Sequence, residues 1–372
     1  MADQLKRASA SRKGAGESAI PPAVPDRKAR HKVEETEMRI VGAGLAAVIS
    51  MSTCTVALAA DHELVLGYLA FKGTSYLEVA ETISDRISKA TDGRVEIKIN
   101  SSLLGGAALA PGIRDRQVDM GLVVDAYYAG TKPLLGVPAL PGLVNSLAEY
   151  RSLMDGDLGA KFAEMWRADF NSVSLMNVPF CPQILASVDA ISTVDELSGK
   201  KLRVHNPETG RLIAAAGAKP TALPAAEILP GLQQGVIDGV FTASCWAEAS
   251  GLPDVVTHVS EWKVAAYLPW ELLINADSLG ELPEDLQKAI TDELAAWQGE
   301  LYDSYEARNQ DLADKWRAHG TNYVVIDDAE ISRLVGDEFS GPVYEAWYGA
   351  AEGAGLDGRA LVESVRASLK SN

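Results

Sequence analysis

The hydrophobic pattern of the chain switches repeatedly between a period of two and a period near 3.6. Residues 64–68 and 94–99 predict strands, the second because apolar and polar residues alternate along it. Apolar residues recur at helical spacing over 80–87, and a further helix over 108–116 leads into a strand over 120–124. Strands and helices that alternate in this order predict a parallel sheet covered by helices.

The same alternation returns in the middle of the chain. Strands are predicted over residues 172–178, 201–204 and 236–241. After the second of these strands, Asn206 is a good N-cap residue for a helix that ends at Gly217. A second strand–helix–strand unit, separate from the first, predicts two α/β lobes with a sheet each.

The segment from Pro283 to His319 is predicted to be one long helix that ends at Gly320. Its apolar residues keep a near-helical period; they are Leu286, Ile290, Leu294, Trp297, Leu301, Tyr305, Leu312 and Trp316. These 37 residues would extend about 55 Å, more than one lobe of this size. Such a helix belongs to a coiled coil or crosses between the lobes, and its Trp and Tyr residues argue against a coiled-coil seam.

Composition agrees with two lobes and narrows the range of partners. The chain has 372 residues, 47% of them hydrophobic, which suits about two domains of roughly 150 residues. Residues 1–60 hold nine Lys/Arg and six Asp/Glu, which leaves 25 Lys/Arg against 45 Asp/Glu, net −20, on residues 61–372. Because so acidic a body repels phosphate backbones, nucleic acid is not expected as a partner.

Met38 begins a segment with the features of an export signal. An Arg follows it, and then comes an apolar stretch of small residues over 40–49. Ala57-Leu58-Ala59 has the A-x-A form that a signal peptidase accepts, so cleavage is expected after Ala59 or Ala60. An uncleaved membrane anchor is the weaker alternative, because glycines and hydroxyl residues leave the span poorly apolar.

These features divide the N-terminal region into two parts. We expect residues 38–60 to be a signal peptide and residues 1–37 to be a disordered extension that is not translated. Three acidic residues, Glu34, Glu35 and Glu37, stand where a signal peptide should be basic, which supports Met38 as the true start.

Two cysteines lie beyond the expected cleavage site, Cys181 and Cys245. An exported protein reaches an oxidising compartment, where a disulfide can form. Two buried free thiols fit the sequence equally well. The chain has no C-x-x-C motif and no His/Cys cluster, so neither a metal nor another cofactor is predicted.

Motifs for catalysis are absent from the sequence. There is no G-x-S-x-G, no phosphate-binding P-loop, no G-x-G-x-x-G and no H-E-x-x-H, and the five histidines are scattered. The carboxylates are spaced as on solvated helix faces. The sequence therefore does not predict an enzyme, although catalytic groups that meet only in space would leave no motif.

A series of segments in fixed order carries a family resemblance. The strongest are residues 195–204 (DELSGKKLRV), 216–220 (AGAKP) and 232–239 (LQQGVIDG). With further short matches, they resemble the solute-binding subunits of tripartite ATP-independent periplasmic (TRAP) transporters, of the dicarboxylate-receptor (DctP) type. The further matches are residues 92–95, 104–105, 118–120 and 279–288. The likeness extends over about residues 64–369.

The resemblance implies an α/β, two-lobed periplasmic binding protein of the Venus-flytrap kind, with a long helix bridging both lobes. Lobe I would comprise residues 61–180 and 268–300, and lobe II residues 181–267 and 301–372. It further implies a periplasmic receptor that delivers a small organic acid to the permease subunits of a TRAP transporter. We expect the receptor to be a monomer.

In the family, the Arg of the L-R-V strand pairs with the ligand carboxylate, which here implies Arg203. Strand alternation agrees, because Leu202 and Val204 share one face and Arg203 lies on the other. The planar guanidinium matches a carboxylate bidentately, which Lys cannot do. Without the surrounding motifs, a solvated surface cation would be the simpler interpretation.

Two departures from the family pattern bear on the ligand. Many acidic-sugar receptors of the family have a second Arg before the first, and the position 20 residues before Arg203 holds Gln183. The Asp-Gly pair that the family often follows with Gln-Glu-Asn is followed here by Val240-Phe241-Thr242, where Thr242 is a small donor. One cation fewer and more apolar surface favour a monocarboxylate with an apolar or aromatic tail over a dicarboxylate or sialic acid.

Five aromatic residues are candidates for the ligand pocket: Phe71, Tyr127, Tyr128, Trp246 and Trp270. Tyr127 and Trp246 rank first because they follow predicted strands, where the loops of a cleft lie. Glu271, beside Trp270, could accept a hydrogen bond from a ligand hydroxyl or face water. Each aromatic side chain is as readily explained by core packing.

Two other functions fit the same pattern. A receptor that serves an ATP-driven importer or a sensor would share the fold and the site, and genes for a small membrane protein and a large permease nearby would argue against it. A periplasmic enzyme acting on an organic acid would need an acid/base pair in the cleft, and turnover of a bound ligand by the pure protein would reveal it.

The export signal gives the first testable prediction. N-terminal sequencing of the exported protein should find a chain that begins at Ala60 or Asp61, because the A-x-A site precedes these residues. An N-terminus upstream of residue 55 would contradict the predicted export signal.

Overall fold

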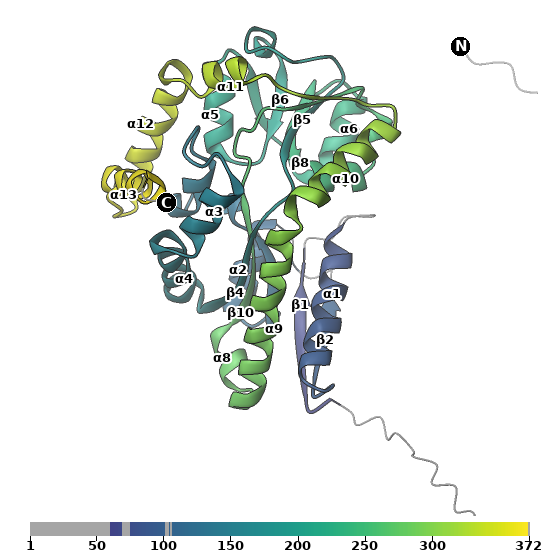
Figure 1. Cartoon of the computed structure of the whole chain (residues 1–372), viewed down its shortest axis with the longest axis vertical. Helices are drawn as coiled ribbons and strands as arrows, with labels where there is room; N and C mark the ends of the chain where they lie inside the picture. Colours follow the sequence, from purple (N-terminus) through teal and green to yellow (C-terminus); the bar gives the residue numbers. More distant parts are fainter. Residues whose placement is uncertain (1–59, 69–74, 101–103, 105, 371–372) are drawn as a thin grey trace, which may run out of the picture. The chain divides into compact units, whose positions relative to one another are not determined.

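The computed structural model describes residues 60–68, 75–100, 104 and 106–370. The predictions for the N-terminal extension and the signal peptide, and the candidate Phe71, lie outside the described residues. Within them, the structure has two sheets, each with helices on its faces (Figure 1). In the part of the chain that the structure describes, no helix combines the length and the apolar content needed to cross a bilayer.

The first sheet has five strands in the order β2-β1-β3-β10-β4. The strands are β1 His62–Gly67, β2 Val95–Asn100, β3 Met120–Val124, β4 Ser172–Pro179 and β10 Pro269–Asn275. β1 pairs in parallel with β2 and β3, as the alternating pattern predicts, whereas β10 is antiparallel to both β3 and β4. A strand from the second half of the chain therefore completes the sheet of the first half.

The second sheet has six strands in the order β11-β9-β5-β8-β6-β7. The strands are β5 Gln183–Ser187, β6 Lys201–Val204, β7 Lys219–Ala222, β8 Gly239–Ala243, β9 His258–Glu261 and β11 Asn322–Val325. β6 is parallel to β7 and β8, and β5 is antiparallel to β8 and β9. The chain passes to this sheet between β4 and β5 and returns between β9 and β10. We call the elements around the two sheets the first and the second lobe.

The helices follow the amphipathic pattern of the sequence. Those before the long helical segment are α1 Ser75–Ala90, α2 Leu109–Arg114, α3 Leu147–Met154, α4 Asp157–Phe170, α5 Pro207–Ala215, α6 Ile228–Gln233, α7 Ser244–Ala249 and α8 Ala276–Gly280. The remaining helices are α9 Glu284–Asp303, α10 Tyr305–Ala318, α11 Asp328–Leu334, α12 Asp337–Gly353 and α13 Gly358–Lys370. α5 begins as predicted, because the Asn206 side chain accepts a hydrogen bond from the Thr209 N–H.

The predicted single helix over Pro283–His319 is interrupted at Ser304, which separates α9 from α10. The Ser304 hydroxyl donates to the Glu300 carbonyl, with 2.7 Å between the oxygens. Such bonds from Ser to the preceding turn compete with the helical ladder and bend helices. The two pieces still connect the lobes: α9 packs on β4 and α1, and α10 packs on β11 and α7 (Figure 1).

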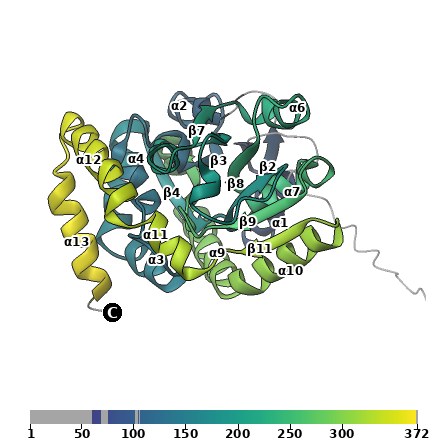
Figure 2. The same cartoon turned by 90° about the horizontal axis from the view of Figure 1, so that it is seen from above.

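The C-terminal helices contact both lobes. α12 packs on α5 of the second lobe, and α13 packs on α3 of the first lobe (Figures 1 and 2). The Trp347 indole N–H donates to the Pro133 carbonyl at 2.9 Å, which ties α12 to the first lobe as well. The boundaries of lobe I and lobe II given above stay a proposal.

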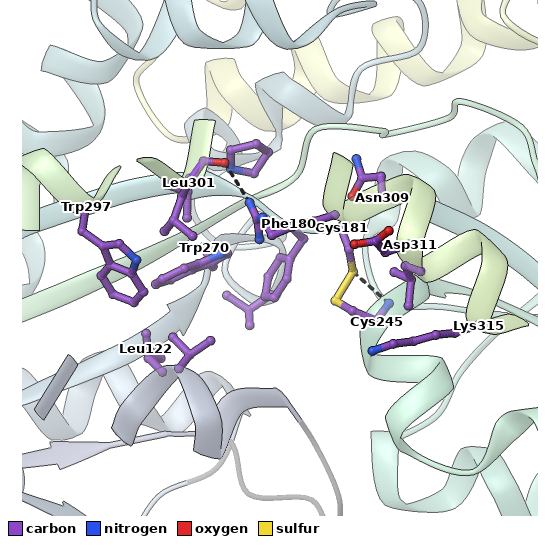
Figure 3. A pocket seen from close by; sticks show the side chains of 16 residues that line it. Leu122, Phe180, Cys181, Cys245, Trp270, Trp297, Leu301, Asn309, Asp311 and Lys315 are labelled. Atoms are coloured by element: carbon purple, nitrogen blue, oxygen red, sulfur yellow. Dashed lines mark hydrogen bonds between the residues drawn. A yellow bond between two sulfur atoms is a disulfide. The ribbon is translucent and has the colours of Figure 1, made fainter. Parts of the chain in front are cut away.

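Cys181 and Cys245 form a disulfide, with 5.9 Å between their Cα atoms (Figure 3). Of the two alternatives that the sequence left open, the structure therefore has the bridge. Cys181 follows β4 in the segment that crosses to the second lobe, and Cys245 lies in the first turn of α7. A disulfide that closes a loop of this length stabilises a fold by about 2–4 kcal/mol.

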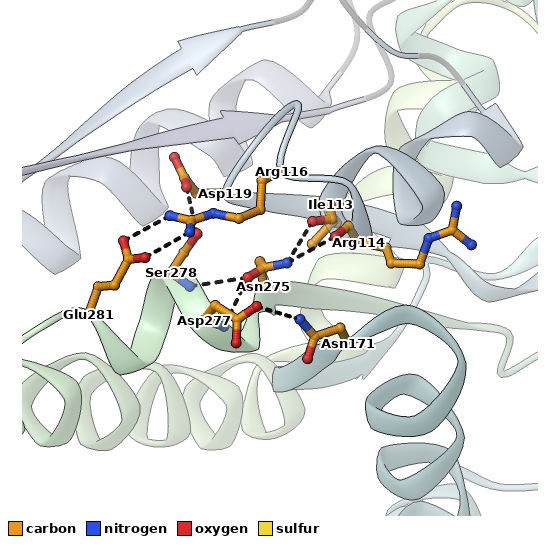
Figure 4. Close-up of polar contacts among 9 residues, drawn as sticks. All are labelled: Ile113, Arg114, Arg116, Asp119, Asn171, Asn275, Asp277, Ser278 and Glu281. Carbon is orange, nitrogen blue, oxygen red and sulfur yellow. Dashed lines mark hydrogen bonds and ion pairs between the residues drawn. The ribbon is translucent and has the colours of Figure 1, made fainter.

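Asn275 connects three elements at the far end of the first sheet (Figure 4). Its side chain is fully buried and donates to the Ile113 carbonyl at 2.9 Å. Its Oδ1 accepts from the N–H groups of Asp277 and Ser278, at 2.9 and 3.1 Å, and so caps α8. The end of β10, the last turn of α2 and the start of α8 therefore share one buried amide.

Two buried carboxyls lie close enough in the core of the first lobe to influence each other's ionisation. Asp125 follows β3 and is 0% exposed, and Glu271 on the neighbouring strand β10 is 1% exposed. Glu271 accepts hydrogen bonds from the Trp166 indole and the Asn177 amide, each at 2.9 Å. Burial and then the charge of Glu271 raise the pKa of Asp125 well above its usual value, and burial also raises the pKa of Glu271. We expect the pair to hold a proton at neutral pH.

Removal of the buried amide should destabilise the protein. Asn275→Ala removes the bonds that its amide donates to the Ile113 and Arg114 carbonyls and leaves the N–H groups of Asp277 and Ser278 without their acceptor, so we expect a loss of about 2 kcal/mol in the free energy of unfolding. Urea denaturation would measure it. Asn322→Ala, at an exposed position of β11, should change stability by less than about 0.5 kcal/mol. An equal effect of the two substitutions would contradict the role of Asn275.

The carboxyl pair should make stability fall as pH rises. The pKa of Asp125 is higher in the folded than in the unfolded protein, so from pH 4 upward the unfolded state ionises first and is favoured. Asp125→Asn removes this effect and should raise stability at pH 7 by about 1 kcal/mol or more, with little gain at pH 4. Thermal unfolding across this range would test it. The exposed Asp292→Asn is the control, and an equal gain at both pH values would exclude the mechanism.

Candidate functional site

Five of the nine predicted site residues surround one cavity of about 30 Å³ between the lobes. The second lobe contributes Gln183 from β5, Arg203 from β6, Thr242 from β8 and Trp246 from α7. Tyr127, which follows β3, comes from the first lobe. The other lining residues are Val124, Phe180, His205, Ala225, Ala243 and Leu268. We call this space the Arg203 cavity.

Strand pairing brings these polar residues together. β5 runs antiparallel to β8, so Gln183 at the start of β5 lies opposite Ala243 at the end of β8, next to Thr242. β6 runs parallel to β8 on its other side, and Arg203 pairs with Val240. The carboxyl ends of β6 and β8 therefore meet the start of β5 at one edge, where ligands of α/β proteins bind.

Arg203 is a buried cation at 4% exposure. Its Nε donates to the Leu223 carbonyl at 3.1 Å, and Tyr127 is a second hydrogen-bonding neighbour. None of the ion pairs among the described residues includes Arg203. Burial lowers its pKa, and Tyr127 opposes that shift. A buried guanidinium without a carboxylate is costly, so the site is prepared for an anion from outside the chain.

The other polar groups of the Arg203 cavity can form hydrogen bonds with the rest of a ligand. Gln183 is 4% exposed, and its Oε1 has no hydrogen-bond partner among the described residues. His205 belongs to the site although the sequence analysis did not select it. Its Nδ1 lies 3.4 Å from the Phe241 carbonyl. The sequence did indicate His205, because a residue two positions after Arg203 lies on the same face of an extended strand.

The titratable groups of the Arg203 cavity do not suit acid/base catalysis. Burial and the charge of Arg203 lower the pKa of His205 to about 3, so its ring is neutral near pH 7. Burial raises the pKa of Tyr127, which keeps its proton there. Arg203, His205 and Tyr127 are the titratable side chains among the described lining residues. A general acid or base works best with a pKa near the operating pH, so this arrangement favours binding.

Trp270 and Glu271 lie on opposite faces of β10. Trp270 lines a second cavity of about 350 Å³, whereas Glu271 lies among the buried groups of the first lobe and borders neither cavity. Neighbouring residues of a strand point to opposite faces, so only one of the two can reach the cleft. Tyr128 is buried in the core of the first lobe, where its hydroxyl accepts from the Ala110 N–H at 3.0 Å, and it lines neither cavity. The remaining candidate, Phe71, is outside the described residues.

The second cavity adjoins the first and is mainly apolar (Figure 3). The two share Val124 and Phe180. Its walls come from both lobes and from the helix pair that connects them, and the disulfide forms part of one side. The lining residues are Val79, Leu122, Val124, Val178, Pro179, Phe180, Cys181, Cys245, Trp270, Trp297, Leu301, Arg308, Asn309, Asp311, Leu312 and Lys315. We call this space the Trp270 cavity.

The described residues contain no group of three or more His, Cys, Asp or Glu side chains that could hold a metal ion. The donor set around the Arg203 cavity is cationic or neutral, which suits an anionic organic ligand better than a metal.

Comparison with curated proteins finds relatives that bind solutes. A solute-binding protein of Roseobacter denitrificans is 27% identical over 79% of this chain and 91% of its own length. The 2,3-diketo-L-gulonate-binding periplasmic protein YiaO of Escherichia coli is 25% identical over 67% of this chain and 74% of its own length.

Solved structures share the fold. A TRAP periplasmic solute-binding protein from Desulfovibrio salexigens with bound orotic acid superposes with a TM-score of 0.72 at 21% identity, covering 82% of this chain and 99% of that one. DctP7 of Bordetella pertussis, a receptor binding pyroglutamic acid, has a TM-score of 0.71 at 21% identity with the same coverage. The two-lobed periplasmic-binding-protein fold is thereby confirmed.

The sequence model of one family covers most of the described body, at residues 66–348. That match confirms the resemblance drawn from the Leu202-Arg203-Val204 strand and its neighbouring motifs. The chain belongs to the bacterial extracellular solute-binding proteins of family 7, the DctP family.

Proposed function

We propose that this protein is an extracytoplasmic receptor that binds a small organic monocarboxylate with an apolar or aromatic tail and delivers it to the permease subunits of a TRAP transporter. In this proposal the protein is a monomer of the periplasm that catalyses no reaction. Membership of the DctP family supports the receptor role. The disulfide between Cys181 and Cys245 supports an oxidising compartment, because such bonds persist there.

The observation that carries the proposal is the buried guanidinium of Arg203 in a cavity between the lobes. No carboxylate among the described residues neutralises it, so a ligand carboxylate would supply the missing charge. Charged hydrogen bonds of this kind contribute about 1.5–3 kcal/mol each, whereas micromolar affinity needs about 8 kcal/mol. Apolar contact must therefore provide much of the remaining free energy.

The Trp270 cavity can provide that contact. It adjoins the Arg203 cavity at Phe180, and its walls include Trp270, Trp297 and Leu122. Burial of apolar surface contributes about 25 cal/mol per Å². A ligand whose carboxylate lies at Arg203 would therefore place its apolar or aromatic tail there.

The ligands of similar proteins agree with an organic acid, but they do not show whether the acid has one carboxylate or two. Their structures contain orotic acid, pyroglutamic acid, L-gulonate and, in one from Sulfurospirillum deleyianum, succinate. We therefore base the proposal of a monocarboxylate on the residues of this chain that line the Arg203 cavity. Gln183 is neutral where many acidic-sugar receptors have a second cation, and the lining includes one Arg and no Lys.

Delivery requires that the ligand-bound receptor differ in conformation from the ligand-free receptor. The Arg203 cavity takes Tyr127 from one lobe and Arg203 from the other, so a bound acid would contact both. A ligand that contacts both lobes favours the closed state by its difference in affinity for the two states. We therefore propose that binding closes the cleft between the lobes.

Replacement of Arg203 should abolish binding without loss of the fold. For Arg203→Ala we expect at least about a hundredfold weaker affinity, because two or more charged hydrogen bonds are lost. Titration calorimetry against a panel of 2-oxo, aromatic and dicarboxylic acids would measure it. Arg211→Ala, at an exposed position of α5, is the matched control. Unchanged affinity would remove Arg203 from the site, and succinate or a sialic acid as the sole ligand would refute the monocarboxylate.

A further inference from the structure

We propose that Arg308 is a second ligand-binding residue, which donates hydrogen bonds to an acceptor oxygen at the far end of the ligand. The inference rests on the proposed function, because it requires the tail of the acid to enter the Trp270 cavity. It narrows the ligand class to an acid with three parts: a carboxylate at Arg203, an apolar or aromatic middle, and a distal carbonyl or hydroxyl oxygen at Arg308.

Arg308 is a cation with unused donors on the wall of an apolar cavity. It lines the Trp270 cavity together with Trp270 and Phe180. Its Nε donates to the Ser304 hydroxyl at 3.2 Å, and its Nη2 donates to the Leu301 carbonyl at 2.8 Å. Because a guanidinium has five N–H groups, these two bonds leave three for other partners. No ion pair among the described residues includes Arg308.

The break between α9 and α10 explains why Arg308 is fixed in this position. In an uninterrupted helix, the Leu301 carbonyl would accept from the backbone N–H four residues later. α9 ends at Asp303, and the Leu301 carbonyl accepts from the Arg308 side chain instead. Ser304, at the break, holds the Nε of the same guanidinium. Two acceptors that belong to the helix break thus orient the planar group before any ligand arrives.

The surroundings make an incoming acceptor favourable. Arg308 is exposed as a residue, and partial burial of its guanidinium lowers its pKa. Lys315 and Asp311 are the other charged residues of the Trp270 cavity, and both are exposed on α10. The lining from β3, β4, β10 and α9 is uncharged. Asn309 and Lys315 are the other lining side chains with N–H donors, but neither has the planar fork of a guanidinium, so Arg308 is the donor that we assign to an acceptor oxygen on the ligand.

The geometry favours a flat middle part for the ligand. Phe180 and Trp270 form a tilted ring pair with 6.5 Å between centroids, on the side of the Trp270 cavity next to the Arg203 cavity. Aromatic rings prefer offset or edge-to-face contact with other rings at such distances. A planar ring that passes Phe180 would pack against this pair while its two ends reach the two guanidinium groups.

Two matched probes test the inference: 3-phenylpropanoate and its analogue with an acetyl group at the para position. For the unaltered protein we expect the acetyl analogue to bind about tenfold to a hundredfold more tightly, the range of one charged hydrogen bond. Arg308→Met keeps the apolar stem but removes the donors, so it should abolish that preference and leave the affinity for 3-phenylpropanoate within about twofold. Calorimetry gives both affinities, and circular dichroism checks the fold.

Control variants separate this inference from the proposed function. Arg317→Met removes the same group from the same helix, where Arg317 pairs with Asp314 rather than lining the cavity, and should keep the preference. Arg203→Ala should weaken both probes equally. Equal affinity of the unaltered protein for the two probes, or a preference that survives Arg308→Met, overturns the role of Arg308 alone. If neither probe binds, the ligand class and this inference are both wrong.

Discussion

The buried charge of Arg203 is the constraint on which the rest of the cleft depends. A guanidinium at 4% exposure loses most of its hydration, and within the described residues its hydrogen-bond partners are the Leu223 carbonyl and the Tyr127 hydroxyl. The good packing of the surrounding strands offsets the cost of burying this charge. Leu202, Val240 and Phe241 are at most 2% exposed. The second lobe thus provides the free energy that keeps a cation ready for an anion.

The segments that connect the two lobes border the Arg203 cavity and the Trp270 cavity. The crossing from β4 to β5 carries Phe180 and Cys181, and the return to β10 carries Leu268 and leads to Trp270. Tyr305, at the start of α10, donates its hydroxyl proton to the Phe180 carbonyl at 2.8 Å. Several residues that line the two cavities therefore lie in the segments that connect the lobes, so occupancy of the cavities and the angle between the lobes would depend on shared contacts.

Much of the fold and the centre of the site could be predicted from the sequence, because both follow strand alternation. Arg203 was identified from its strand face and its motifs, and the same alternation also indicated His205. Trp270 and Glu271 could not be separated, because they are adjacent and only the placement of β10 decides which faces the cleft. The proposed role of Arg308 could not be predicted, because its orientation depends on the interruption at Ser304, which a continuous apolar stripe conceals.

The position of β10 also determines how much of the chain must emerge during synthesis before the first sheet can form. β3 and β4 do not pair with each other, because β10 lies between them in the first sheet. A nascent chain that has emerged only as far as residue 260 can complete most of the second sheet, whereas the first sheet remains divided into two pieces. The first sheet is thus the later one to be completed, and its unpaired strand edges need protection until residue 275 has emerged.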